Sequence, residues 1–260
     1  MNDDGAPAVK SANRRVALIT GGSRGIGRAT ALRFADDGLD VAFCFLSNRS
    51  AAAETASEIE KRGVRALPIR VNIGNEAHVE KMFHKVRDQF GVLDIFISNA
   101  AAGVLKPAME LTIRDWDRSM DVNVKALLLG AQHASALMKG RPDSRIIALT
   151  STGASRVIPN YAAVGASKAA IEALVRYLAL ELKPAGITVN AVSAGVVDTD
   201  SLRLFPNRDQ LLAAAAARTP AGRVQSAEDV AGIISLLCSP DADWITGEIV
   251  IADGGYSLPA

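Results

Sequence analysis

The sequence predicts an α/β fold in which helices cover both faces of one doubly wound parallel sheet of about seven strands. Three observations support this prediction. Short apolar segments alternate with helical segments along the chain. Most of the apolar segments are continuous rather than alternating, which is typical of strands buried on both faces. Glycine follows most of the helical segments, where a chain that leaves a helix favours a positive φ.

The individual elements follow in chain order. The expected strands are residues 16–20, 41–46, 66–71, 93–98, 145–151, 188–192 and 248–252. The expected helices are residues 26–37, 51–62, 76–90, 112–139, 160–182 and 227–238. The residues that mark helix ends are Gly38, Gly63, Gly91, Gly140, Pro184 and Gly186. Because crossovers between parallel strands are right-handed, the ligand crevice is expected at the carboxyl ends of the strands.

Composition indicates a single globular domain over residues 14–260, with 49% hydrophobic and 22% charged residues in a chain of 260. Residues 1–13 are expected to form a disordered tail, and residues 200–223 a lid over the substrate. A net charge of +1 provides no overall field for nucleic acid or an anionic membrane. No apolar run approaches the roughly 20 residues of a membrane span. Two cysteines without a Cys-x-x-Cys pair favour a reducing, cytoplasmic location.

No metal site is expected, because the three histidines lack the spacing of a ligand set. Two expected helices, residues 112–139 and 160–182, carry apolar side chains on more than one face, which indicates a subunit interface. The sequence therefore predicts a protein that is not a monomer.

A glycine-rich turn follows the first strand and reads Thr20-Gly-Gly-Ser-Arg-Gly-Ile-Gly27. Glycines between a strand and a helix let backbone amides approach a pyrophosphate, so the turn predicts dinucleotide binding. The letters also fit the nucleophile elbow of hydrolases, but no histidine follows His133 to complete a triad. They fit P-loop spacing too, yet Arg28-Ala29 stands where lysine and a hydroxyl are required. The expected contacts in this turn are Gly21, Ser23, Arg24, Gly25, Ile26 and Gly27.

The end of the second strand decides between NAD(H) and NADP(H). An acidic residue there would bind the ribose hydroxyls of NAD, but the chain reads Leu46-Ser-Asn-Arg49. Arg49, together with Arg24, could instead bind a 2′-phosphate with two hydrogen bonds. The sequence therefore favours NADPH over NADH.

Further motifs resemble the short-chain dehydrogenase/reductase family in their order along nearly the whole chain. These are the glycine-rich turn, Asn99-Ala-Ala101, Asn123, Ser151, a tyrosine followed by Lys168, and Ala194-Gly-x-x-x-Thr199. The resemblance implies a Rossmann-type domain and an NAD(P)H-dependent oxidoreductase, with Thr199 near the nicotinamide carboxamide. By the same resemblance, further cofactor contacts are expected at Asn72, Ile73, Asn99, Ala100, Lys168, Gly195, Val197 and Thr199. It also implies a homotetramer.

The catalytic tyrosine departs from the usual family spacing. Val164 stands four positions before Lys168, where the tyrosine is usually found, and Tyr161 stands seven positions before it. Seven residues make nearly two helical turns, so both side chains are expected on one helix face, about 10.5 Å apart along the axis. A tyrosine displaced in this way favours conjugate reduction, in which a hydride goes to Cβ of an enoyl thioester. Tyr161 would then stabilise the enolate oxygen, while Lys168 would hold the ribose and favour ionisation of the tyrosine.

The segment from Gly153 to Lys168 is similar to the active-site segment of bacterial enoyl-acyl carrier protein reductases. Residues 99–111, 198–200, 205–208 and 219–223 are closely similar to the NADPH-dependent type III enzymes of that group. This resemblance implies reduction of trans-2-enoyl thioesters, carried on acyl carrier protein, in fatty-acid biosynthesis. Ser151 is expected to assist Tyr161. Asn123 is expected to kink its helix and hold a water near the lysine, or alternatively to bond a neighbouring carbonyl. The substrate pocket is expected to include Ala101, Val104, Leu105, Ile158, Leu202 and Phe205.

Two other functions stay open at this point. A 3-oxoacyl-acyl carrier protein reductase, or another carbonyl reductase, would use Tyr161 at a ketone oxygen. A non-catalytic NADP(H)-sensing regulator would keep the glycine-rich turn without turnover.

Overall fold

A computed structural model describes residues 14–199, 202 and 208–258. Seven parallel strands form one sheet in the order β3-β2-β1-β4-β5-β6-β7, which confirms the predicted doubly wound fold. The strands are β1 Val16–Ile19, β2 Asp40–Phe45, β3 Ala66–Arg70, β4 Ile95–Ser98, β5 Ser144–Ser151, β6 Ile187–Ala194 and β7 Ile249–Ala252. The strand order reverses between β1 and β4, so the ligand crevice of this topology lies at their carboxyl ends.

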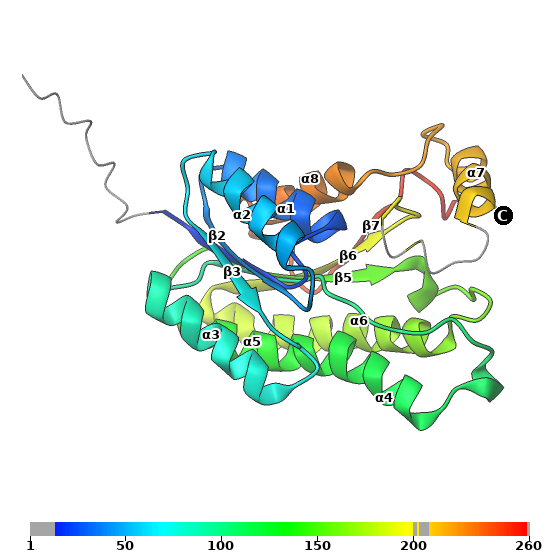
Figure 1. Ribbon diagram of the computed structural model, residues 1–260, viewed down its shortest axis with the longest axis horizontal. Helices are drawn as coiled ribbons and strands as arrows, with labels where there is room; N and C mark the ends of the chain where they lie inside the picture. Colours follow the sequence, from blue (N-terminus) through cyan, green and yellow to red (C-terminus); the bar gives the residue numbers. More distant parts are fainter. Residues whose placement is uncertain (1–13, 200–201, 203–207, 259–260) are drawn as a thin grey trace, which may run out of the picture.

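Helices cover both faces of the sheet (Figure 1). One face carries α1 (Gly25–Asp36), α2 (Arg49–Glu60) and α8 (Ala227–Leu237). The other carries α3 (Glu76–Phe90), α5 (Ala126–Leu137) and α6 (Ala162–Leu182), and α4 (Ile113–Met120) precedes α5. Helix α7 (Arg208–Arg218) lies beyond the end of the sheet, beside the carboxyl end of the chain. None of the helices in the described ranges has an apolar stretch of the length that crossing a bilayer requires.

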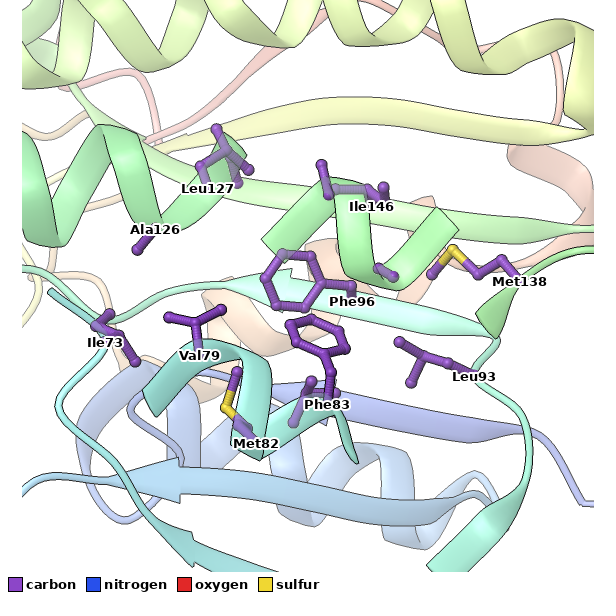
Figure 2. Close-up of a cluster of buried hydrophobic side chains, with 14 of the residues drawn as sticks. Ile73, Val79, Met82, Phe83, Leu93, Phe96, Ala126, Leu127, Met138 and Ile146 are labelled. Atoms are coloured by element: carbon purple, nitrogen blue, oxygen red, sulfur yellow. The ribbon is translucent and has the colours of Figure 1, made fainter. Parts of the chain in front are cut away.

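Two apolar clusters, one on each face, hold the helices on the sheet. Figure 2 shows the cluster beneath α3 and α5, in which Phe83 of α3 faces Phe96 of β4. Their ring centroids lie 5.7 Å apart in an edge-to-face arrangement, which is favourable for aromatic pairs. Gly130 lets α5 approach closely, because a Cβ at this position would lie 2.4 Å from the Phe96 ring. This packing fixes β4, whose carboxyl end leads directly to Asn99.

Two of the differences between the predicted and the observed elements concern the helices before and after β5. The helix expected over residues 112–139 is divided, because a π-helical turn at Asp121–Lys125 separates α4 from α5. The helix expected from residue 160 begins at Ala162, after a turn in which Asn160 has a φ of 63°. The five glycines predicted to end helices all have positive φ, which confirms that prediction. The predicted tail at residues 1–13 lies outside the described residues.

Candidate active site

The glycine-rich turn between β1 and α1 is bonded to the end of β4. Thr20 Oγ1 accepts hydrogen bonds from the backbone N–H groups of Asn99 and Ala100, at 2.9 and 3.0 Å. The Asn99 side chain donates to the carbonyls of Thr20 and Gly21, at 2.8 and 3.3 Å. Asn99 and Ala100, which the family resemblance implies as cofactor contacts, therefore support the turn at the point where the strand order reverses.

The first turn of α1 suits an anionic ligand. Its N-cap residue, Arg24, makes no side-chain capping bond, and no acidic side chain lies in the first turn. Gly25 has a φ of 53°, so the chain enters the helix through a conformation that side chains rarely adopt. Four other helices, α2, α3, α4 and α8, are capped by the side chains of Asn48, Asn75, Thr112 and Ser226. The amides of α1 are thus left for a ligand, and they fit the pyrophosphate of a dinucleotide.

The residues expected around the adenosine end lie at the neighbouring strand ends. Arg24 and Arg49 are both exposed, the latter at the first position of α2. Asn72 is exposed after β3, and its Oδ1 accepts a hydrogen bond from Gly74 N–H at 3.1 Å. Ile73 is buried in the core below. Arg24 and Arg49, the two arginines expected to bind a 2′-phosphate, are therefore accessible to solvent.

The loop after β6 carries the residues expected at the nicotinamide. Val197 is buried, whereas Gly195 and Thr199 are partly exposed. A Cβ on Gly25 would lie 3.3 Å from Thr199 Cγ2, so this loop meets the amino end of α1. The turn and the loop thus border one site at the carboxyl ends of the strands.

Tyr161 and Ser151 form the hydroxyl pair of the site. Ser151 Oγ lies 3.4 Å from the phenolic oxygen of Tyr161, and either atom can donate. Tyr161 is the N-cap residue of α6, one position before the helix begins at Ala162, and not inside the helix as expected. The turn before the helix has two features: Asn160 has positive φ, and its carbonyl accepts a hydrogen bond from Lys106 N–H at 2.8 Å.

Lys168 is buried, with only 6% of its surface exposed. Its Nζ donates to the Leu149 carbonyl at 2.7 Å. Burial lowers the pKa of Lys168 to about 8. Burial also raises the pKa of Tyr161, and the hydrogen bond with Ser151 partly opposes this effect. Burial therefore dominates the shift in the pKa of Tyr161.

Asn123, where a kink was expected, lies in the π-helical turn, at which the helix departs from regular α-helical geometry. Its side chain accepts a hydrogen bond from Ala102 N–H at 2.8 Å and donates to the Ala102 carbonyl at 3.0 Å. It also donates to Ser167 Oγ at 2.8 Å. The structure therefore supports the alternative reading, in which Asn123 bonds a neighbouring backbone group and positions the loop after β4.

The expected substrate pocket is only partly described. Ala101 is exposed, and the side chains of Val104, Leu105 and Ile158 are half-buried. Leu202 is also half-buried, whereas Phe205 lies outside the described residues. The region expected to form a lid contains α7, which ends at Arg218 and contacts the C-terminal segment through that residue.

Comparisons with known proteins agree with this geometry. Residues 21–257 match the family model described as "Enoyl-(Acyl carrier protein) reductase". A short-chain dehydrogenase from Burkholderia cenocepacia J2315, solved in complex with NADP, is 34% identical with a TM-score of 0.87, over 94% of this chain and 98% of that one. The chain belongs to the short-chain dehydrogenase/reductase family. This reductase is accordingly an NAD(P)H-dependent oxidoreductase.

Two further relatives of the reductase differ in the reaction that their names state. The 1-cyclohexenylcarbonyl-CoA reductase of Streptomyces collinus is 40% identical over 249 residues, which are 95% of this chain and 88% of that protein. The promiscuous reductase LugOII, which catalyses keto-reduction at C1 during lugdunomycin biosynthesis, is 36% identical with a TM-score of 0.85. The match spans 95% of this chain and 99% of the LugOII chain.

Sequence reasoning missed Gly153 as a residue of the reductase site. A Cβ on Gly153 would lie 2.5 Å from Cε1 of Tyr161 and 3.2 Å from Ile158 Cδ1. The Tyr161 ring therefore packs on the bare backbone after β5, which brings its hydroxyl to Ser151. A glycine two residues after Ser151 is the only signal in the sequence, and by itself it does not distinguish a contact from a turn.

Replacement of Gly153 by alanine is expected to move the Tyr161 ring and to lower kcat about tenfold or more, because a small misplacement of a proton donor is costly. Steady-state kinetics with NADPH and an enoyl thioester measure this. Gly232→Ala in α8 is the matched control, because nothing lies within 4 Å of a Cβ at that position. Equal kcat values for Gly153→Ala and the unchanged protein would contradict the packing argument.

Proposed function

We propose that this reductase uses NADPH to reduce the C2=C3 double bond of trans-2-enoyl thioesters. The observation that carries the proposal is the place of the phenol: Val164 occupies the usual position, and Tyr161 reaches Ser151 from outside α6. The name of the Streptomyces relative supports it, since a 1-cyclohexenylcarbonyl group is an acyl group whose double bond is conjugated with the carbonyl. The family model, described as an enoyl-acyl carrier protein reductase, points to the same reaction.

The chain's own residues account for each requirement of this chemistry. The amides of α1 bind the pyrophosphate, and the loop from Gly195 to Thr199 borders the nicotinamide. When bound, the reduced nicotinamide supplies the hydride that bonds to Cβ. Negative charge then develops on the thioester oxygen, where the Tyr161 hydroxyl donates a hydrogen bond and then its proton. Uptake of one proton at Cα from water, with return of the enol proton to the Tyr161 phenolate, completes the saturated thioester and restores the phenol.

The environment of Tyr161 suits a proton donor. Because burial raises its pKa, the phenol is protonated at neutral pH. Ser151 holds the hydroxyl and limits its rotation. In this reaction the hydride goes to Cβ, which takes up no proton. The task of Ser151 is therefore to orient Tyr161.

Carbonyl reduction is the second candidate, and the same hydroxyl pair favours it. Two hydroxyls 3.4 Å apart can both donate to one ketone oxygen. The keto-reduction stated for LugOII provides a relative with this type of reaction. A 3-oxoacyl thioester is the carbonyl substrate that shares most with the proposed enoyl substrate.

Parallel assays distinguish the two reactions. NADPH oxidation is measured with crotonyl-CoA and with acetoacetyl-CoA at equal concentrations. The proposal expects turnover with crotonyl-CoA at least about tenfold faster, since specificity of this kind follows differential transition-state binding. Oxidation with acetoacetyl-CoA alone rejects it in favour of carbonyl reduction, and NADPH binding without turnover of either thioester favours the sensing regulator.

Replacement of both Arg24 and Arg49 by alanine is expected to raise KM for NADPH about tenfold or more and to leave KM for NADH unchanged. The reason is that hydrogen bonds to a charged phosphate are each worth roughly 1.5–3 kcal/mol, and NADH has no 2′-phosphate. Kinetics with both cofactors measure the ratio. An equal rise for NADPH and NADH would show that the arginines do not read the 2′-phosphate.

We further propose that acyl carrier protein delivers the substrate during fatty-acid biosynthesis in the cytoplasm, and that the active form is a homotetramer. The exposed apolar side chains Tyr177 and Leu180 on α6 support a subunit interface, because large apolar surfaces of this kind are usually covered. Turnover of the same acyl group on acyl carrier protein and on coenzyme A tests the carrier, and light scattering tests the tetramer.

A further inference from the structure

Gln225 joins the ends of two strands beside the cofactor site. Its Oε1 accepts a hydrogen bond from Gly195 N–H at 2.9 Å, and its Nε2 donates to the Ala252 carbonyl at 2.7 Å. Residue 225 also forms a parallel backbone bridge with Val197. We call this set of contacts the Gln225 bridge. Because it holds both Gly195 and Val197, it determines where the chain runs after it leaves β6.

The opposite side of Gly195 rests on Asp253. A Cβ on Gly195 would lie 3.1 Å from Asp253 Cβ, so the two residues pack without space between them. Asp253 is only 6% exposed, and its carboxylate accepts hydrogen bonds from the N–H groups of Gly255 and Ser257, both at 2.9 Å. The loop after β6 therefore contacts both Gln225 and a C-terminal turn, residues 253–257, whose hydrogen bonds are made by Asp253.

The C-terminal turn also contacts the segment after β5 and the end of α7. Arg156, five residues after Ser151, donates to the Ser257 carbonyl. Arg218, at the end of α7, donates to the Tyr256 carbonyl at 3.1 Å and lies 5.1 Å from the centre of its ring. Figure 1 shows α7 beside this end of the chain. The turn thus joins the segment after β5, the loop after β6 and α7.

We propose that Gln225 is a positioning residue for the nicotinamide end of the cofactor. The Gln225 bridge fixes the loop from Gly195 to Thr199 against the amino end of α1, and this loop borders the nicotinamide in the proposed function, on which the inference rests. A carboxamide suits this task because it donates on one side and accepts on the other. Loss of the bridge leaves the adenosine end of the site intact, since Arg24 and Arg49 lie at other strand ends.

Asn190 provides a matched comparison at the opposite end of the same two strands. Its Nδ2 donates to the Ile245 carbonyl at 2.7 Å, and its Oδ1 accepts from Glu248 N–H at 3.0 Å. Asn190 therefore also joins β6 to the segment that leads into β7 through one carboxamide. It lies four residues before the end of β6, away from the loop that borders the nicotinamide. Loss of this bond should lower stability alone.

The experiment compares Gln225→Leu with Asn190→Leu. For each protein, the Kd of NADPH and the Kd of adenosine 2′,5′-bisphosphate, which lacks the nicotinamide, are measured by calorimetry, together with the thermal midpoint. Gln225→Leu is expected to weaken NADPH about tenfold, because two hydrogen bonds of ordinary strength are lost, and to leave the bisphosphate unchanged. Asn190→Leu is expected to lower the midpoint and to leave both Kd values unchanged. Unchanged NADPH affinity in Gln225→Leu, or equal weakening of both ligands, overturns the inference.

A second variant keeps the test valid if Gln225→Leu fails to fold. In Gln225→Glu, the introduced carboxylate still accepts from Gly195 but repels the Ala252 carbonyl, so NADPH affinity is expected to fall at pH 8 and to recover as the pH drops and the carboxyl protonates. Absence of this recovery, relative to the unchanged protein, overturns the inference. The proposed function fails separately, if the unchanged protein binds NADPH but reduces no enoyl thioester.

Discussion

Replacement of Tyr161 by phenylalanine is expected to lower kcat for an enoyl thioester by about 10²- to 10⁴-fold, which is the usual contribution of a positioned proton donor. The phenol is the group that meets the developing enolate oxygen, and its ring packs on Gly153 in a way that phenylalanine can reproduce. Only the hydroxyl is removed, so NADPH affinity and the thermal midpoint should stay within error of the unchanged protein. Single-turnover measurements of NADPH oxidation separate the chemical step from product release.

Tyr177→Phe is the matched control for this change. Tyr177 lies on the surface of α6 proposed as a subunit interface, and phenylalanine keeps its apolar ring there, so removal of the hydroxyl should leave kcat unaltered. Ser151→Ala adds a second comparison, because the two candidate reactions require different things of Ser151. In enoyl reduction it only orients the phenol, and we expect a loss smaller than that of Tyr161→Phe. Equal losses would indicate that both hydroxyls donate to one ketone oxygen, and activity retained in Tyr161→Phe would reject the assigned chemistry altogether.

The fold was predictable because its signals are local. A continuous apolar run such as Val16–Ile19 indicates a buried strand wherever it occurs, and a glycine such as Gly91 ends the preceding helix through its own backbone conformation. The parallel order of the strands then follows from the handedness of the crossovers. Arg145 shows the limit of predictions from local sequence signals. It lies inside β5 and is fully buried, with its guanidinium within 4 Å of Asp143 and Asp243.

The predicted site residues that the structure describes lie at neighbouring strand ends, but the geometry that joins them was not predictable from the sequence. Spacing alone suggested that Tyr161 and Lys168 share a helix face. The entry into α6 instead depends on Asn160, whose carbonyl bonds to Lys106, a residue more than fifty positions earlier. Gln225 was missed for the same reason, since its partners Gly195 and Ala252 are distant in sequence. Contacts of this kind become visible only when the strands are assembled.

Burial of Lys168 is expected to make the free energy of unfolding depend on pH, and the contribution of this one side chain can be measured separately. Its pKa is lowered by burial from 10.5 to about 8, so at neutral pH the folded protein contains a buried ammonium that the unfolded chain exposes to water. Between these two values the unfolded state binds more protons, and stability therefore rises with pH. The shift corresponds to on the order of 3 kcal/mol, gained progressively from about pH 8 to pH 10.5.

Two other groups act in the opposite direction in the same range. Burial raises the pKa of Cys44 from 9.0 to about 11 and that of Cys238 from 9.0 to about 12. The folded protein keeps these thiols protonated while the unfolded chain ionises, so their contribution to stability is lost as the pH rises above 9. The free energy of unfolding of the unchanged protein therefore combines opposing contributions as the pH rises. A comparison with a variant that lacks the Lys168 charge is required to isolate its contribution.

Lys168→Met provides that difference, because methionine fills a similar volume without a charge. The free energy of unfolding of the unchanged protein minus that of Lys168→Met, from urea titrations followed by circular dichroism, should rise by on the order of 3 kcal/mol between pH 8 and pH 10.5. Lys61→Met, at an exposed position of the turn after α2, should give no such rise. Turnover by Lys168→Met should fall at least about a hundredfold at every pH, since Lys168 is the buried cation nearest the hydroxyl pair along α6. A flat difference would mean that the ammonium is solvated, and the structural basis for a buried charge in the site would then be lost.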